Sequence, residues 1–305
     1  MTELSTPFHA GERYVQQRAG AQREALLNGR IIAAEITPAV HAFVAAQQLT
    51  VLGTLDALGR PWASVVFGPA GFVRVLDAHH AALDVTELRA DAADACWANT
   101  AVGARVGLLL LELRTRRRFR LNGAVAARSA AQLVVEVHQA FPNCPKYIQR
   151  RSARALPAVA ATEPVAFTTF GAAHQGLLRQ ADTFFVASAN AARDVDASHR
   201  GGRPAFVQVL DATTLLVPDY PGNGMFNTLG NFVSYPRAGL LFVDFASGRM
   251  LQMTGTVALA WDQPGTEDET GGTARFWRFS LEAGQELRGL HGGAWSEPEY
   301  SPFNP

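Results

Sequence analysis

The stretch PDYPGNGMFNTLGNFVSYPRAGLLFVDFASGRMLQMTG, residues 218–255, determines how the rest of the chain is interpreted. It contains a turn rich in proline, glycine and asparagine, then a short helical segment, then two apolar strands. Such a turn brings backbone N–H groups and small amides together at a strand end, where they can hold an anionic group. Residues 218–255 are therefore the best candidate for a binding site.

The strands of this stretch repeat a pattern that occurs earlier in the chain. A shift of 134 residues superposes residues 51–85 on residues 185–219 without a gap, and a shift of 132 residues places RVGLL (105–109) on RAGLL (237–241). Identical pairs at the first shift include Ala63 with Ala197, Ser64 with Ser198, and Gly68 with Gly202. Agreement over several strands indicates an internal duplication of one β-rich unit.

Short runs of β-branched and aromatic residues, separated by turn residues, predict an antiparallel sheet in the first copy. The runs are residues 50–55, 61–67, 71–76, 104–112 and 119–126. Five or six strands of this kind favour a small barrel or sandwich. Residues 130–140 (AAQLVVEVHQA) are predicted to be helical, and the N-terminal region is predicted to form helices broken near residues 28–29 and 37–38.

These patterns divide the 305 residues into four parts. The parts are an N-terminal helical segment (1–48), a first repeat (49–150), a linker (151–180), and a second repeat with a C-terminal tail (181–305). The first repeat is degenerate, because apolar and charged residues stand where the second repeat carries Gly, Asn, Ser and His. One copy is therefore expected to supply most of a ligand site, and the other a scaffold and one wall.

The composition argues against several classes of function. Twenty-seven basic residues balance twenty-seven acidic ones, which gives no electrostatic reason to expect nucleic acid or an anionic membrane as partner. The two cysteines, Cys96 and Cys144, cannot form a disulfide framework, and no Cys/His spacing indicates a metal site. No apolar run approaches the roughly 18 residues of a membrane span, and the polar N-terminus lacks a signal sequence. A cytoplasmic protein is expected.

One basic cluster lies between apolar segments of the first repeat and consists of Arg114, Arg116, Arg117, Arg118 and Arg120. We interpret it as the turn and solvent face of a hairpin, in preference to a nucleic-acid patch. A phosphate-sized ligand at this cluster is the alternative left open. Lys146 is the only lysine of the chain and follows two closely spaced prolines, so a stiff loop presents it.

Four motifs carry a resemblance to a known family: FHAGERYVQQRAG (8–20), FPNCPKYIQRR (141–151), SHRGG (198–202) and PDYPGNGMFNTLGN (218–231). Together they resemble the FMN-binding split-barrel superfamily related to pyridoxamine 5′-phosphate oxidase, in particular its two-repeat branch of flavin-nucleotide-binding proteins. The resemblance implies a mainly β fold with flanking helices (α+β). It further implies two tandem split β-barrels, each with six antiparallel strands, that form an intramolecular pseudo-dimer with FMN at the interface.

The resemblance also implies which residues contact FMN. The ring and ribityl chain would be approached by Ser198, His199, Arg200, Gly201 and Gly202. The ribityl and phosphate groups would be held by Asp219, Tyr220, Asn223, Asn227 and Thr228. Further contacts would come from Gln252 and Thr254 on one face of a strand, and from the cross-interface cations Lys146 and Arg150. From the residues alone, Asn223 and Asn227 could instead cap the following helix, and His199 and Arg200 could form a solvated turn.

The chain departs from the family pattern in two places. Residues 227–228 are Asn-Thr where the better-known oxidases carry an Arg/Lys pair, so the phosphate must be neutralised by Arg200, Arg203, Lys146 or Arg249. Residues 275–305 show no match to the residues that bind pyridoxal phosphate in the oxidase. Oxidation of vitamin B6 is therefore not predicted.

Two functions are compatible with these motifs. The first is an FMN-dependent oxidoreductase that acts on a small molecule and takes electrons from a nicotinamide or a separate reductase. The second is a non-catalytic flavin or haem carrier on the same fold. Whether the chain is an enzyme is left open, because His199 is the only candidate proton donor in the second copy and no acid–base pair is evident. The chain would be a monomeric pseudo-dimer or a homodimer.

Overall fold

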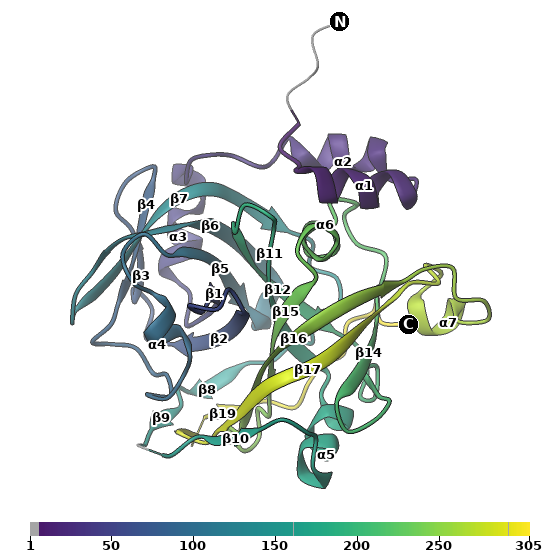
Figure 1. The fold of residues 1–305 in the computed structure, drawn as a ribbon. Helices are drawn as coiled ribbons and strands as arrows, with labels where there is room; N and C mark the ends of the chain where they lie inside the picture. Colours follow the sequence, from purple (N-terminus) through teal and green to yellow (C-terminus); the bar gives the residue numbers. More distant parts are fainter. Residues whose placement is uncertain (1–5, 161, 292) are drawn as a thin grey trace, which may run out of the picture.

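The computed structural model describes residues 6–160, 162–291 and 293–305, and it shows two antiparallel sheets that meet at the centre of the molecule (Figure 1). The first sheet has seven strands in the order β2 (Pro61–Phe67), β1 (Leu49–Leu55), β5 (Arg105–Glu112), β6 (Arg117–Arg128), β7 (Gln132–Asn143), β4 (His80–Asp84) and β3 (Val73–Val75). The second has eight, in the order β12 (Val195–Gly201), β11 (Thr183–Ala189), β15 (Arg237–Val243), β16 (Met250–Ala260), β17 (Phe276–Leu287), β14 (Thr214–Pro218) and β13 (Gln208–Val209), with β10 (Val165–Phe167) paired to β17. The same strand order therefore occurs in both halves.

The helices are short and lie around the sheets. They are α1 (Ala10–Arg18), α2 (Gln22–Gly29), α3 (His41–Ala45), α4 (Cys96–Asn99), α5 (Ala172–Gln180), α6 (Asn227–Ser234) and α7 (Glu267–Thr270), with 3-10 turns at Pro38–Val40 and Leu113–Thr115. The expectation of a mainly β chain with flanking helices is confirmed. No helix in the described parts of the chain has the length and apolar character needed to cross a bilayer.

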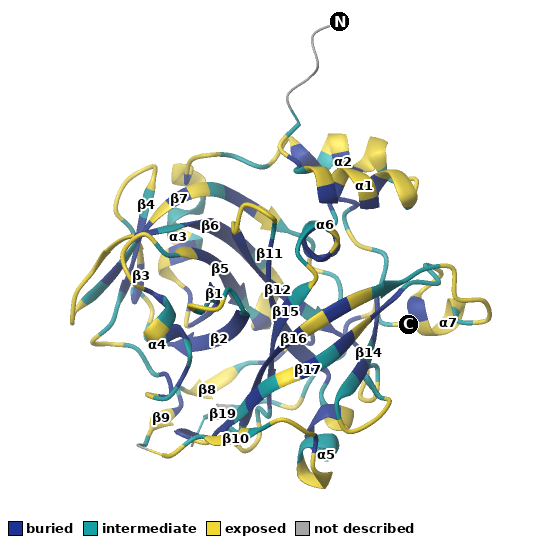
Figure 2. Cartoon of the chain, viewed as in Figure 1, coloured by how far each residue is buried: buried dark blue, intermediate teal, exposed yellow. Residues whose placement is uncertain are grey.

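The central strands are buried on both faces because each face packs into a different core (Figure 2). In β5, Leu108 and Leu110 pack into the core of the first sheet, whereas Leu109 and Leu111 pack into a core shared by the two sheets. Strands β11 and β15 alternate in the same way between the core of the second sheet and the shared core. This arrangement explains why residues 108–111 read as an unbroken leucine run, since no face of the strand is solvated.

The two sheets dock through one strand of each. Strand β2 packs against β11, β15 and β16, and β12 packs against β1, β5 and β6. Glycines permit this close approach: a Cβ atom at Gly107 of β5 would lie 2.7 Å from the backbone nitrogen of Ala197, and one at Gly239 of β15 would lie 2.6 Å from the carbonyl oxygen of Pro61. The halves therefore pack in a pseudo-symmetric manner, backbone against backbone.

Two sequence-based expectations about the sheets are wrong. The segment 130–140 is not helical, because strand β7 begins at Gln132, and within it Leu133, Val135 and Val137 are buried and Glu136 is exposed. An alternation with period two describes a strand, and the β-branched residues support it. The second correction concerns closure: each sheet is an open path of strands and not a closed six-stranded barrel.

The segment expected to link the repeats contains regular structure. It includes β8 (Ala153–Ala155), β9 (Ala158–Val159), β10 and α5. The C-terminal tail returns to it, because β18 (Leu290–His291) pairs with β9 and β19 (Ala294–Trp295) pairs with β8. Trp295 packs against Phe67 and Phe245, with ring centres 6.1 and 5.2 Å apart, so the tail contacts both halves.

The N-terminal helices cover one end of the second half. Helix α1 packs against α6 (Figure 1), and the two helices approach closely at Gly11 and Gly230. His9 is the N-cap of α1 and forms a capping box with Glu12, whose Oε2 accepts from the backbone nitrogen of His9 at 2.8 Å. The residues that start α1 thereby lie next to the N-terminal end of α6.

Candidate functional site

A cleft lies where the two halves and the connection between them meet. Its walls come from β6 of the first sheet, from residues 143–147, from the end of β12, and from residues 218–229, which include the first turn of α6. Ten of the residues expected to contact a ligand line it: Lys146, Ser198, His199, Arg200, Gly201, Asp219, Tyr220, Asn223, Asn227 and Thr228. The Gly/Asn-rich turn and the SHRGG segment therefore share one cavity.

Four residues expected in the site lie elsewhere. Arg150 is half exposed and pairs with Glu299, with Nη2 and Oε2 2.6 Å apart. Gly202 lies one residue beyond the lining of the cleft. Gln252 and Thr254 are buried on β16, on the other side of the interface. Alternation along β16 does place both side chains on one face. That face meets β2, where Gln252 contacts Ala63 and Ser64, and not the cleft.

Three arginines converge on the cleft. Arg118 and Arg120 project from β6, and Arg200 projects from β12. Arg118 Nε donates to the carbonyl oxygen of Cys144 at 2.7 Å. The buried Nε of Arg200 has no hydrogen-bond partner within the described part of the chain. An unpaired buried donor beside two other guanidinium groups is the pattern of a site that an anion completes.

The electrostatics of the cleft agree with this geometry. Burial, and then the charges of Arg200 and Arg120, lower the pKa of Arg118 to about 9. Burial also lowers the pKa of Arg200, an effect that the charge of Asp219 opposes. Asp219 is itself held by Arg275, whose Nε and Nη2 lie 3.0 and 2.9 Å from Oδ2. The cations of the cleft thus repel one another, and a bound anion would relieve this repulsion.

Arg120 connects the first sheet to the second. Its Nε donates to Ala197 O at 3.1 Å, its Nη2 to Ser198 Oγ at 2.6 Å, and its Nη1 to Asn227 Oδ1 at 3.1 Å. Asp196 supplies a counter-charge, with Oδ1 3.4 Å from Nη1. Burial lowers the pKa of Arg120, and the charges of Asp196 and Glu12 oppose that effect.

Helix α6 begins at the wall of the cleft without a side-chain cap. The residue before it, Phe226, has a left-handed backbone with φ of 59°, and its side chain makes no capping hydrogen bond. Asn227 is not a cap either, because its amide links Arg120 Nη1 to Glu12 Oε1. Thr228 Oγ1 lies 3.0 Å from Ser198 Oγ. The free N–H groups of the first helical turn are thus a second feature that favours an anion.

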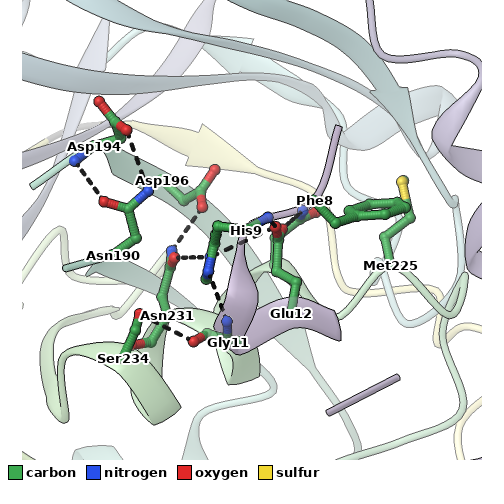
Figure 3. Close-up of polar contacts among 12 residues, drawn as sticks. Phe8, His9, Gly11, Glu12, Asn190, Asp194, Asp196, Met225, Asn231 and Ser234 are labelled. Carbon is green, nitrogen blue, oxygen red and sulfur yellow. Dashed lines mark hydrogen bonds and ion pairs between the residues drawn. The ribbon is translucent and has the colours of Figure 1, made fainter. Parts of the chain in front are cut away.

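Behind this wall, a polar network joins the N-terminal segment to Asn231 of α6 and Asp196 of β12 (Figure 3). His9 Nε2 contacts Asn231 Oδ1 at 3.0 Å, and Asn231 Nδ2 donates to Asp196 Oδ2 at 2.7 Å. Burial, followed by the charge of Asp196, raises the pKa of Glu12 to about 8, although its hydrogen bond with Asn227 acts in the opposite direction. Glu12 therefore carries its proton at neutral pH.

His199 lines the cleft, but its ring is isolated. The ring packs edge-on against Phe185 with centres 5.9 Å apart, and both buried ring nitrogens lack a partner among the described residues. Burial, and then the charges of Arg118 and Arg200, lower its pKa well below the ordinary value. A neutral imidazole cannot serve as an imidazolium proton donor, which argues against the role in acid catalysis that the sequence suggested.

Aromatic side chains form the other part of the cleft. The rings of Tyr147 and Tyr220 lie 4.9 Å apart, and Phe206 lies 6.4 Å from Tyr220. Tyr147 donates from its hydroxyl to Pro221 O at 2.8 Å, which fixes the ring. The ammonium nitrogen of Lys146 lies 5.5 Å from the centre of the Phe303 ring. The cleft thus combines a basic end with an aromatic surface.

Arg118 and Arg120 were not among the residues expected in the site, because the arginine cluster was interpreted as the turn and solvent face of a hairpin, with a phosphate-sized ligand as the alternative. Arg114 and Arg117 are indeed exposed, whereas Arg120 is 3% exposed. A signal was present in the repeat, because the 132-residue shift aligns Arg118 and Arg120 with neutral residues in the second copy. Charge on one face of a strand in a single copy indicates function more than solubility.

Part of the chain is similar to known proteins. Residues 36–164 match the family model described as pyridoxamine 5′-phosphate oxidase, and the sequence has no match among curated proteins. This match covers less than half of the chain, and it shows that residues 36–164 are similar to that family.

Several solved structures are similar to part of the chain. One, from Clostridium acetobutylicum, is a protein related to general stress protein 26 of the pyridoxinephosphate oxidase family (12% identity, 40% of this chain and 90% of that chain, TM-score 0.29). Another is HutZ, the heme storage protein from Vibrio cholerae (9% identity, 42% and 93%, TM-score 0.26). A third is an F420 reductase (14% identity, 40% and 94%, TM-score 0.26).

Proposed function

We propose that the cleft binds FMN through its phosphate group and that the chain is a flavin-dependent oxidoreductase acting on a small molecule. The observation that carries this proposal is the buried, unpartnered Nε of Arg200 beside Arg118 and Arg120. The uncapped start of α6 offers further donors to the same phosphate. The residues present therefore suit a dianionic phosphate.

The remainder of the cleft suits the rest of the cofactor. Tyr220 and Phe206 offer an apolar surface for a planar ring, and Asn223 offers polar atoms for a ribityl chain. When bound, FMN supplies hydride or single-electron transfer, with electrons from a nicotinamide or a separate reductase. The protein itself would hold the phosphate, orient the ring and limit its access to water.

Comparing FMN with riboflavin tests the phosphate assignment. Quenching of flavin fluorescence should show that riboflavin, which lacks the phosphate, binds at least about tenfold more weakly than FMN, since charged hydrogen bonds contribute about 1.5–3 kcal/mol. Equal affinities would contradict the assignment, and so would an absence of FMN binding. Loss of the flavin absorbance on addition of NADH or NADPH tests the proposed oxidoreductase activity.

His199 gives one reason to keep haem binding as a second candidate. Its neutral, buried imidazole has two unpartnered nitrogens at the cleft, and a neutral imidazole is a common metal ligand. Titration with haemin should then produce a Soret band that His199→Ala abolishes, with the basic residues facing the propionates. Binding of FMN in the absence of a Soret band would support flavin binding over haem binding.

A further inference from the structure

The basic cleft has a counterpart on the opposite side of the interface. Ser64 is the fourth residue of β2 and Ser198 the fourth residue of β12, and the two strands pair with β1 and β11 in the same register. Gln252 and Arg120 likewise occupy the same register position on β16 and β6. The pairs Ser64/Gln252 and Ser198/Arg120 are therefore equivalent under the pseudo-symmetry.

The two pairs make the same contacts across the interface. Arg120 donates to the carbonyl oxygen of Ala197 and to Ser198 Oγ. Gln252 Nε2 donates to Ala63 O and to Ser64 Oγ, both at 2.9 Å. The hydrogen bonds of one pair are thus reproduced in the other, with an amide in place of the guanidinium group.

The counterpart has lost the positive charges of the cleft. The registers of the strands place Val66, Met250 and Gln252 where the cleft has Arg200, Arg118 and Arg120. A phosphate would find no cation among these three side chains. Hydrogen-bond donors remain, however, because Gln252 keeps an amide and Ser64 a hydroxyl.

A carboxyl group of the chain itself meets these donors. Asp94 Oδ1 accepts from Ser64 Oγ, from Gln252 Nε2 at 3.1 Å and from the backbone nitrogen of Cys96 at 2.8 Å. Asp94 is 3% exposed, and its Oδ2 has no partner within the described part of the chain. The short helix α4 that follows packs on β1 and β2, as α6 packs on β11 and β12.

We propose that this region is a second copy of the oxyanion site and that the Asp94 carboxyl group is its resident, intramolecular ligand. The site takes one carboxyl- or phosphate-sized oxyanion, and Asp94 keeps it closed. The chain then offers a single open site, so it binds one FMN and not two. That stoichiometry rests on the proposed function, whereas the occupancy of the second site by Asp94 does not.

Chemical rescue tests the occupancy without any flavin. Asp94→Ala leaves Ser64 Oγ, Gln252 Nε2 and the Cys96 nitrogen facing a space of the size of a carboxyl group. Sodium formate, compared with sodium chloride at equal ionic strength, should raise the melting temperature of this variant by about 2–4 °C, as expected for a ligand that binds the native state only. Wild type and Asp94→Asn, whose side chains fill the space, should not respond.

Equal responses of all three proteins to formate would overturn the proposal. If Asp94→Ala does not fold, Asp94→Ser provides a smaller change that still leaves room for formate, and the same comparison applies to it. A fluorescence titration of wild type with FMN gives the second readout. One equivalent per chain supports a closed second site, and two equivalents contradict it. No FMN binding together with formate rescue would refute the proposed function while the assignment of Asp94 stands.

Discussion

Arg120 Nη2 lies 2.6 Å from Ser198 Oγ, across the interface between the two sheets. Arg120 belongs to the first half of the chain, whereas Ser198 belongs to the SHRGG segment of the second half. The first half thus supplies a buried cation to a cleft whose other walls come largely from the second half and the connection. The cleft is complete only when the two halves are docked.

Replacing Arg120 by the residue at its pseudo-symmetric position should remove much of the affinity for FMN. Arg120→Gln keeps a donor for Ser198 but removes the charge, and the affinity should fall about 10- to 100-fold. Quenching of flavin fluorescence measures this change. Arg117→Gln is the matched control, because Arg117 is exposed on the same strand and lies outside the cleft. A similar loss in both variants would show that general charge, and not this contact, determines binding.

The buried carboxyl group of Glu12 should make the stability of the protein depend on pH. Its pKa in the folded chain is about 8, against an ordinary value of 4.5, so the folded state retains the proton more strongly than the unfolded state. The stabilisation is complete below about pH 4.5, declines as the pH rises, and is lost above about pH 8. Wild type should therefore lose a few kcal/mol relative to Glu12→Gln between pH 5 and 8.5.

Chemical denaturation at several pH values measures this difference. The two proteins differ only at residue 12, so subtracting one curve from the other isolates the effect of the Glu12 carboxyl group. Parallel curves for wild type and Glu12→Gln would contradict a raised pKa at Glu12.

The sequence predicted the fold more fully than the site. Repeated strand patterns predicted two similar β-rich halves, and the strand registers follow the 134- and 132-residue shifts. The segment 130–140 was assigned wrongly because alanines at its start suggested a helix, although its valines alternate in burial. Pairing with β4 and β6 is a tertiary effect, and it outweighs local propensity here.

Most of the residues expected in the site do share one cavity, because a contiguous turn and a strand end carry them. The sequence could not show that Gln252 lies on the opposite side of the interface from the cleft. Its partners are on β2 of the other half, and they depend on how the two halves dock. It also could not show the contact between Glu12 and Asn227, which depends on the packing of α1 against α6. Long-range packing determines both features, and no local pattern encodes it.

The surroundings of two helical glycines predict opposite effects for the same substitution. A Cβ atom at Gly230 would lie 2.5 Å from Glu12 Cγ and 2.6 Å from its backbone, so Gly230→Ala should destabilise the protein by about 1–3 kcal/mol. Gly176 of α5 has no neighbouring atom within 4 Å of such a Cβ, and Gly176→Ala should stabilise by about 0.5–1 kcal/mol. Urea denaturation of both variants tests this contrast, and an equal sign in both would contradict it.

Arg275, which lies outside the cleft, should control the charge that Asp219 presents to the cleft. Arg275 does not line the cleft, but both of its contacting nitrogens bind Asp219 Oδ2. In Arg275→Met, Asp219 loses this partner and becomes a counter-ion for Arg200, so it competes with the phosphate. We expect about tenfold weaker FMN binding, because the Asp219 carboxylate then neutralises a guanidinium group that would otherwise hold the phosphate.

A second substitution separates this charge effect from simple damage to the fold. Adding Asp219→Asn to Arg275→Met removes the competing carboxylate. FMN affinity should then return to within about twofold of wild type, because residues 219 and 275 together carry no net charge in either protein. The single variant Asp219→Asn should bind FMN at least as tightly as wild type. Dissociation constants measured at low and moderate ionic strength decide the matter, because competition by a charge weakens as salt screens it. If the double variant binds as weakly as Arg275→Met alone, Arg275 supports the cleft by packing against Phe226, whose ring centre lies 5.2 Å away, and not by restraining Asp219.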